Sequence, residues 1–487
     1  MKLHNLFIYE NLTIKEVMIV ISSGGQGFAL SVEQENHNFI RIISDGDIRR
    51  ALIRGVGLSS CIDVIQKTQS IVVSANTPIS EIWQKFTEEV RVIPVLDQYN
   101  QVIDVHTFDK RSHISVAKPI LNHRELELVT ECIAGGWISS GGNFVKEFER
   151  AVASHTGVKH AISCSSGTAA LHLILMSYGI GPGDEVIVPT LSFIATANAV
   201  SYTGAKPVFV DSEKNTWNID PEKIVQAITP KTKAIIPVHL YGHPAEMDSI
   251  NQIAAKYDLK VIEDAAEAQG ALYKKRRVGA LADAATFSFF GNKIVTTGEG
   301  GMIVTNDSII AEKCKIFRDH GMSIEKRYWH KVLGYNYRLT NLQAAIGVAQ
   351  MEKIDYISNQ KKIIAAEYSK HLKEVDGITL PPDEDWADNV FWLFTILIDE
   401  EITGFNVEML TSFLSENQIE SRVVFYPIHT QPIYDTKQKL PIAEEVSRKG
   451  ISLPSAPDIS LKEIKLICDV INRICVKFYN KVSYEKS

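Results

Sequence analysis

The chain has 487 residues, of which 45% are hydrophobic and 22% charged, and its formal net charge is −7. This composition excludes a disordered, collagen-like or coiled-coil chain, and the acidic balance gives no general attraction to nucleic acid or to an anionic membrane. The six cysteines form no Cys-x-x-Cys pair, and polar residues interrupt the N-terminal segment. We therefore expect a cytoplasmic protein with no signal peptide, no membrane span and no metal site.

The first 115 residues contain a loose internal repeat. Thr13 and Thr77 each precede an amphipathic segment that is typical of a capped helix. Strands are predicted next, over 27–32 and 39–43 in the first copy and over 92–96 and 101–105 in the second. Because such a unit cannot bury its apolar face alone, we expect the two copies to pack together.

The first copy continues into the segment SDGDIRRALIRG, residues 44–55. With this segment, residues 1–115 resemble a tandem pair of cystathionine-β-synthase (CBS) domains. The resemblance implies an adenine nucleotide whose ribose is held by Ser44 and Asp47. In the second copy, Thr107 is followed by Lys110 in place of the acid. The alternative is a packing or oligomerisation module that binds no ligand.

A linker is predicted over 112–122, and the pattern then changes. Continuous apolar runs alternate with helical segments such as 245–257, and the runs cover 160–163, 185–189, 207–211, 234–238 and 261–264. Strands of this kind are buried on both faces, so residues 116–355 are predicted to form an α/β domain with a mostly parallel sheet. A helix over 357–374 and a strand over 391–396 predict a smaller α+β domain over 356–487.

Chemistry-bearing residues follow three of the predicted strands. Small residues over 165–169 expose backbone N–H groups at a helix N-terminus, which suits a phosphate, although a capped helix without ligand has the same pattern. Asp264 ends a strand, where ligands of open α/β sheets bind, and it either pairs with a cationic ring nitrogen or only caps the next segment. Lys293 lies between an apolar strand and a glycine-rich turn, where desolvation lowers a lysine pKa and favours Schiff-base chemistry. A fourth feature is the polar-aromatic loop over 334–341.

A phosphate site, a strand-end acid and a buried lysine match the phosphate, pyridine nitrogen and aldehyde of pyridoxal 5'-phosphate (PLP). The segments SSGTAALHL, EDAAEA, FSFFGNKIVTTGEGGMIVTN and VVFYPIHTQPIY extend the match. Through them, residues 118–480 resemble the fold-type-I sugar aminotransferases of the DegT/DnrJ/EryC1/StrS family.

The resemblance implies a role for each matching residue. Lys293 is the catalytic lysine that carries PLP, Asp264 pairs with the ring nitrogen, and Glu267 lies near the ring hydroxyl. The other cofactor contacts implied are Gly167, Thr168 and Ser288 at the phosphate, Phe193 on the ring face, and Asn336, which reaches the phosphate of a neighbouring subunit and so implies a homodimer with shared active sites. The substrate contacts expected are Arg338, Tyr426 and His429.

The resemblance also implies the reaction. L-Glutamate is the expected donor, and the favoured acceptor is GDP-4-dehydro-6-deoxy-D-mannose, which amination at C4 converts to GDP-perosamine. GDP is favoured over UDP because UDP-specific relatives tend to have FNGNK where this chain has FFGNK. The alternatives are a UDP-sugar aminotransferase, a PLP-dependent sugar dehydratase with histidine at the lysine position, and a nucleotide-sensing protein whose PLP domain is inactive. Lys293 argues against the dehydratase, and Lys293 with Asp264 argues against the inactive protein.

Overall fold

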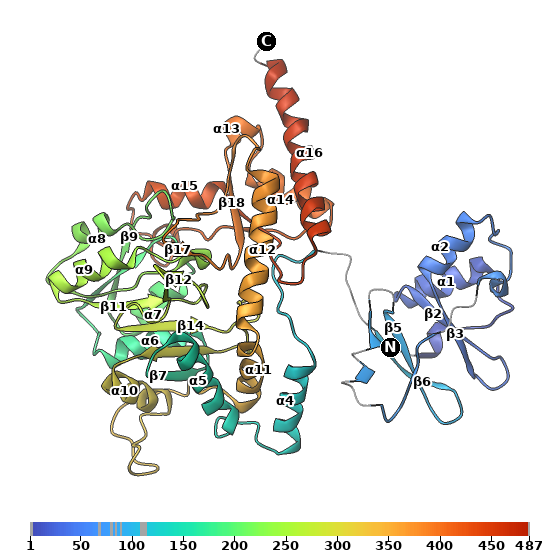
Figure 1. Ribbon diagram of the computed structural model, residues 1–487, viewed down its shortest axis with the longest axis horizontal. Helices are drawn as coiled ribbons and strands as arrows, with labels where there is room; N and C mark the ends of the chain where they lie inside the picture. Colours follow the sequence, from blue (N-terminus) through green and yellow to red (C-terminus); the bar gives the residue numbers. More distant parts are fainter. Residues whose placement is uncertain are drawn as a thin grey trace. The chain divides into compact units, whose positions relative to one another are not determined.

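The computed structural model describes residues 3–66, 70–77, 81–82, 85–87, 90–107 and 114–485 (Figure 1). The chain divides into two compact units, Met1–Arg111 and Ser112–Ser487. Within the described ranges, no helix is both long and apolar enough to cross a membrane.

The N-terminal unit contains two three-stranded sheets that share one plan. Their strands are β1 (Phe7–Ile8), β2 (Phe28–Val32) and β3 (Phe39–Ser44), and β4 (Val73–Ser74), β5 (Val92–Leu96) and β6 (Val102–Thr107). In each sheet the first strand is parallel to the middle strand and the third is antiparallel to it. In each sheet, the pairing of the middle strand with the third strand also shifts register near the end of the middle strand. The repeat in the sequence is therefore also a repeat of strand pairing.

The two copies contact each other, as the sequence predicts. Phe28, Leu30 and Val32 of β2 share one buried cluster with Leu96 and Val102 of the second copy. The side-chain N–H of Asn100 donates to the carbonyl of Phe39 over 3.2 Å. Residues 78–80 of the helix expected after Thr77, and Lys110, lie outside the described residues.

The C-terminal unit is built on a seven-stranded sheet. Its order is β7 (His160–Cys164), β15 (Gly301–Thr305), β14 (Ala284–Ser288), β11 (Lys260–Asp264), β10 (Thr232–Ile235), β8 (Glu185–Pro189) and β9 (Lys206–Val210). Only β15 is antiparallel to its neighbours within this sheet. Val186 and Val188 enter one buried cluster while Ile187 enters another. Burial on both faces explains why these strands have continuous apolar sequences.

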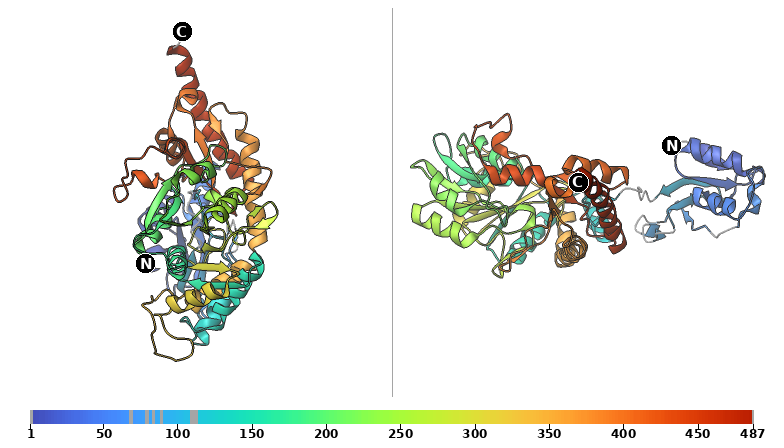
Figure 2. Two further views of the ribbon diagram at one scale, coloured as in Figure 1. Left: turned by 90° about the vertical axis from the view of Figure 1, so that its left-hand side faces the viewer. Right: turned by 90° about the horizontal axis from the view of Figure 1, so that it is seen from above.

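Helices supply the other side of both clusters. The cluster that contains Val186 and Val188 also includes Leu173, Ala199 and Ile310, which come from helices α6 (Gly167–Ser177), α7 (Ala195–Tyr202) and α10 (Ser308–Arg318). The cluster that contains Ile187 includes Phe148, Ile250 and Val348, which come from helices α5 (Asn143–Thr156), α9 (Met247–Tyr257) and α11 (Asn341–Met351). The result is a three-layer α/β arrangement, as Figures 1 and 2 show for this unit.

The end of the chain forms a second, antiparallel sheet. Its order is β16 (Ile378–Thr379), β18 (Phe394–Ile398), β20 (Gly450–Leu453) and β19 (Arg422–Val423), and α12 (Ile354–Leu372), α14 (Val407–Glu416) and α16 (Leu461–Glu485) pack with it. Figures 1 and 2 show α16 projecting from this end of the unit. The expected domain boundary at 355 falls in the first turn of α12.

Two sequence predictions differ locally from the structure. The strand predicted over 391–396 begins only at Phe394. Phe391 has a φ of 45°, and its N–H donates to the Asn389 side chain over 2.7 Å, so the chain turns before the strand. The expected linker lies within the C-terminal unit and packs against the rest of it, because Val116 is buried and its N–H donates to the Glu420 carboxylate over 3.0 Å.

Candidate active site

Asp264 is the last residue of β11, at the edge of the sheet where parallel strands end. Its carboxylate accepts a hydrogen bond from Thr196 Oγ1 over 2.8 Å and one from the Ala266 N–H over 3.2 Å. The side chain is buried, and burial raises the pKa of Asp264 even though the Thr196 hydroxyl opposes that shift. A cationic group placed beside Asp264 would stabilise its ionised form.

Lys293 lies in the turn after β14, next to β11. Its Nζ is 3.7 Å from Glu267 Oε1 and 3.7 Å from the centroid of the Trp392 ring. Glu267 also accepts the Tyr241 N–H over 2.8 Å. Burial lowers the pKa of Lys293 and raises that of Glu267, while the attraction between the two opposes both shifts. A desolvated amine of this kind is a competent nucleophile and base.

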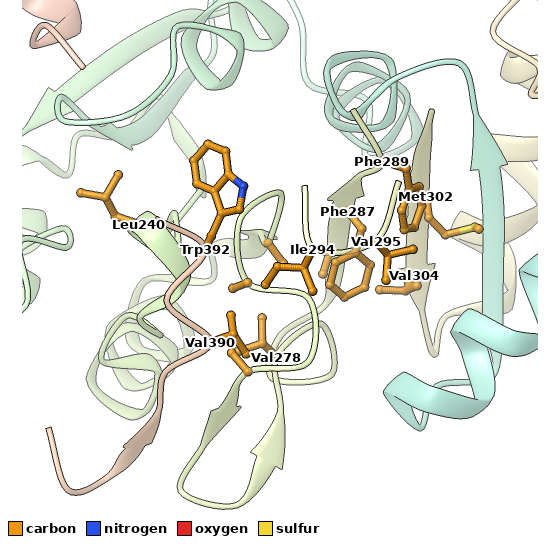
Figure 3. Close-up of a cluster of buried hydrophobic side chains, with 14 of the residues drawn as sticks. Leu240, Val278, Phe287, Phe289, Ile294, Val295, Met302, Val304, Val390 and Trp392 are labelled. Carbon is orange, nitrogen blue, oxygen red and sulfur yellow. The ribbon is translucent and has the colours of Figure 1, made fainter. Parts of the chain in front are cut away.

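The turn that carries Lys293 is fixed by apolar packing. Figure 3 shows Ile294 and Val295 in one cluster with Phe287 and Phe289, and Trp392 belongs to the same cluster. Trp392 Nε1 donates to the carbonyl of Asn292 over 2.8 Å. Packing and hydrogen bonding therefore hold the residues on both sides of the lysine.

A helix N-terminus lies near the end of β14. Ser166 caps α6 by accepting the Ala169 N–H over 3.1 Å. A Cβ atom on Gly167 would lie 3.0 Å from Ser288 Cβ, so the two segments approach as closely as a glycine allows. The first N–H groups of a helix have no intrahelical partner, so those of Gly167 and Thr168 are suited to an anion.

Aromatic rings surround the site. Tyr241 stacks on Trp392 at 6.1 Å and on Phe425 at 5.5 Å between ring centroids. The ring centroid of Phe193 lies 5.9 Å from that of Phe425, and 57% of the Phe193 surface is exposed. The exposed side chain leaves room for a planar ligand, and the role of Phe193 on the cofactor face stays a prediction.

The remaining predicted site residues differ in exposure and in their partners. Tyr426 is exposed, whereas Arg338 forms an ion pair with Asp319. Asn336, two residues earlier, forms an isolated β-bridge with Asp319. His429 is buried, with Nδ1 2.7 Å from Thr190 Oγ1 and Nε2 3.3 Å from Glu444 Oε1. The substrate roles of Arg338, Tyr426 and His429 and the cofactor role of Asn336 stay predictions.

Sequence reasoning missed three residues of the site. Thr196 is one hydroxyl among several in its segment, and nothing local links it to Asp264. Tyr241 has a φ of 52°, which presents its N–H to Glu267. Trp392 falls in the strand expected over 391–396, but the chain has a positive φ at Phe391, and the Trp392 ring lies over the Lys293 amine.

In the N-terminal unit, Ser44 and Asp47 begin α2 (Asp45–Ile53) as a capping box. Asp47 Oδ2 accepts the Ser44 N–H over 2.9 Å and the Ser44 hydroxyl over 2.7 Å. Arg50 pairs with Asp47 at 2.5 Å. Burial alone would raise the pKa of Asp47, but these hydrogen bonds lower it overall. Both predicted nucleotide contacts therefore have partners within their own helix.

The residues of the C-terminal unit fit PLP. The close approach at Gly167 leaves a helix N-terminus for the phosphate, buried Asp264 suits a protonated ring nitrogen, and buried Lys293 suits the aldehyde. This sheet and this donor set define a type I PLP-dependent enzyme. A sequence profile of the DegT/DnrJ/EryC1/StrS aminotransferase family matches residues 119–472, and the chain belongs to this family.

Individual relatives agree with this assignment. The GDP-perosamine synthase of Escherichia coli O157:H7 is 47% identical over 74% of this chain and 98% of its own length. The dTDP-3-amino-3,6-dideoxy-alpha-D-galactopyranose transaminase of Aneurinibacillus thermoaerophilus is 41% identical over 71% of this chain and 94% of its own. The structure of Helicobacter pylori PseC, an aminotransferase involved in the biosynthesis of pseudoaminic acid, superposes with a TM-score of 0.71 at 30% identity, over 75% of this chain and 100% of PseC. The C-terminal unit is thus a PLP-dependent nucleotide-sugar aminotransferase, and residues 1–118 precede the matched range.

Proposed function

We propose that this enzyme transfers the amino group of L-glutamate to C4 of GDP-4-dehydro-6-deoxy-D-mannose and forms GDP-perosamine. The observation that carries amino transfer is the convergence of two largely buried ionisable groups: Asp264 ends β11, and Lys293, whose side chain is 11% exposed, lies in the turn after the neighbouring β14. The choice of sugar is supported by the similarity to the E. coli GDP-perosamine synthase, 98% of whose length is matched by this chain.

The chain's own residues account for the proton transfers. PLP, when bound, supplies an electron-withdrawing ring that stabilises negative charge at the donor carbon. Lys293 takes a proton from that carbon and later returns one, and its lowered pKa keeps a fraction of the amine neutral for this task. Asp264 keeps the ring nitrogen protonated, and Thr196 orients Asp264. Trp392, on which Tyr241 stacks, covers one side of the amine and excludes water there.

The test is a substrate comparison with the full-length protein. Glutamate is supplied with 4-keto-6-deoxy sugars linked to GDP, UDP or dTDP, and aminated products are identified by mass spectrometry. The proposal expects product from the GDP sugar and none from Lys293→Ala protein. Product only from a UDP or dTDP sugar would reject the nucleotide assignment but keep the enzyme class. Amino transfer that persists in Lys293→Ala would reject the role of that lysine.

The active site is proposed to be shared between two copies of the chain. Exposed apolar side chains cluster just before Asn336, at Ile324, Tyr328, Trp329 and Leu333. Exposed apolar surface of this kind marks an interaction site, and a second copy is the occupant that the predicted role of Asn336 requires. Mixing Lys293→Ala protein with an Asn336→Ala variant should restore part of the activity through hybrid dimers. A fully active monomer at assay concentration would contradict the shared site.

The N-terminal unit is proposed to be a CBS pair that binds one adenine nucleotide at Ser44 and Asp47. A carboxylate accepts hydrogen bonds from both ribose hydroxyls, and Arg50 supplies a cation beside it. Calorimetric titration with AMP, ADP and ATP should show at most one strong site per chain, which is lost in Asp47→Ala. Two equal sites, or binding that survives the substitution, would reject the assignment.

A further inference from the structure

Lys361 is a buried lysine that the proposed chemistry does not use. It lies on α12 with a 3% exposed surface. Its Nζ donates to the carbonyl of Trp392 over 2.8 Å and to the carbonyl of Ser455 over 2.5 Å. Burial lowers the pKa of Lys361 to about 7. A neutral amine has two N–H groups, one for each of these carbonyls.

The two carbonyls belong to segments that meet at the second sheet. Ser455 follows β20; its hydroxyl accepts the Phe394 N–H over 2.9 Å, and its own N–H donates to the carbonyl of Val116 over 2.8 Å. Trp392 lies two residues before β18. Lys361 therefore joins α12 to the entrance of one strand and the exit of its neighbour.

Trp392 is the contact that links this junction to the active site. Its ring centroid lies 3.7 Å from Lys293 Nζ, and its Nε1 donates to the Asn292 carbonyl. Its main chain precedes the ladder of β18, so sheet pairing does not fix it. Gly242 also approaches this main chain closely, because a Cβ there would lie 3.0 Å from the N atoms of Phe391 and Trp392. The backbone at Trp392 thus packs against Gly242 and accepts a hydrogen bond from the Lys361 amine.

We propose that Lys361 is a positioning residue for the active-site lysine: it holds the main chain at Trp392 so that the indole face stays over the Lys293 amine. This inference rests on the proposed role of Lys293 as the residue that carries PLP. Contact with an indole face stabilises a cation, so displacement of the ring makes protonation at Lys293 less favourable.

The test uses the full-length protein with its cofactor and measures the pH midpoint of the cofactor's absorbance change. Lys361→Met removes both donors but keeps the apolar stem, and Trp392→Leu removes the indole. Each single substitution should lower the midpoint by about half a pH unit or more. The double variant should have the midpoint of Trp392→Leu alone, because Lys361 acts through Trp392. An unchanged midpoint in Lys361→Met, or additive shifts in the double variant, would overturn the proposal.

Lys362→Met is the matched control. Lys362 is the next residue of α12, is partly exposed, and pairs with Asp388 at 2.5 Å. Its replacement should leave the midpoint unchanged. An equal shift in Lys362→Met would mean that loss of any lysine from α12 has this effect, and the specific role of Lys361 would be rejected. If Lys361→Met does not fold, Lys361→Gln replaces it in the same cycle. Gln keeps two N–H donors on a shorter side chain and should give a smaller shift that vanishes beside Trp392→Leu; a shift that persists there counts against the proposal.

Failure of this inference differs from failure of the proposed function. Borohydride treatment followed by peptide mass spectrometry shows whether the cofactor is attached to Lys293. Absence of the label in the wild-type protein rejects the role of Lys293 itself. A label on Lys293, together with a pH midpoint that does not change in Lys361→Met, rejects only the positioning role of Lys361.

Discussion

The two units contain polar motifs that look equally suited to a ligand in the sequence but differ in the structure. In the N-terminal unit, Asp47 bonds to both Ser44 and Arg50 within the first two turns of α2. In the C-terminal unit, Asp264 and Lys293 come from separate segments, and burial disfavours the charged form of each. The first motif is complete without a ligand, whereas the second places ionisable groups where a ligand with complementary charge would relieve the cost of burial.

The difference shows how a motif gains functional weight. A Ser-x-x-Asp pattern before a helix is explained by capping alone, since the same arrangement of Thr13 and Glu16 begins α1 (Ile14–Gly24). Capping does not explain Lys293, which lies in a turn beside Glu267, because the two side chains come from separate segments and neither begins a helix. Burial and convergence of ionisable groups therefore separate the two motifs better than their residue types.

The largest expected effect tests the buried acid. Asp264→Asn removes the charge that keeps the ring nitrogen protonated, so the amino-transfer rate should fall by about 10²- to 10⁴-fold. Asp283→Asn is the control, because Asp283 lies at the opposite end of the same strand pair and accepts the Val261 N–H over 2.9 Å. Steady-state rates with glutamate measure both. A rate within twofold of wild type in Asp264→Asn would make Asp264 no more than a structural cap.

A smaller effect concerns stability and the buried amine of Lys361. Its folded-state pKa of about 7 lies below the ordinary value of 10.5. Between these values the unfolded chain binds a proton that the folded chain does not, so the free energy of unfolding rises with pH. The slope is at most about 1.4 kcal/mol per pH unit, and below pH 7 the contribution is constant.

Lys361→Met should lack that rise. Denaturant unfolding of both proteins at several pH values between 7 and 10 measures the difference. Parallel curves for the two proteins would show that the folded chain keeps Lys361 protonated. Burial would then not disfavour the charged form of Lys361 in the C-terminal unit.

Thr196→Val tests whether one hydroxyl tunes the acid. The substitution keeps the side-chain volume and removes the donor to Asp264 Oδ2, so the pKa of Asp264 should rise further. A lost hydrogen bond to a charged group is worth about 1.5–3 kcal/mol, and a rate decrease of about tenfold or more is expected. Thr203→Val, at the C-cap of the same helix, is the control: it removes a bond to the Val200 carbonyl and one from the Ala205 N–H, and neither involves Asp264. Equal decreases in both variants would indicate general damage to α7.

The sequence predicts the elements that have local causes. The strands of the large sheet are continuous apolar runs because both faces are buried, and Asp264 and Lys293 are visible because each follows such a run. The contact between Trp392 and Lys293 joins residues about a hundred positions apart and depends on the backbone of Phe391. Thr196 reaches Asp264 only because β8 and β11 end at the same edge of the sheet. Such contacts arise from tertiary packing, and local pattern carries no trace of them.

The smallest expected effect decides between capping and ligand binding in the N-terminal unit. Ser44→Ala removes the cap of α2 and should cost about 1 kcal/mol locally, which speeds amide hydrogen exchange in α2 about fivefold. Thr13→Ala does the same to α1 and is the matched control. Neither substitution should change amino transfer, since the residues assigned to that chemistry lie after residue 118. If Ser44→Ala abolishes nucleotide binding while Thr13→Ala preserves it, the capping residues of α2 also form a ligand site. If both variants bind nucleotide as wild type does, Ser44 is a cap alone.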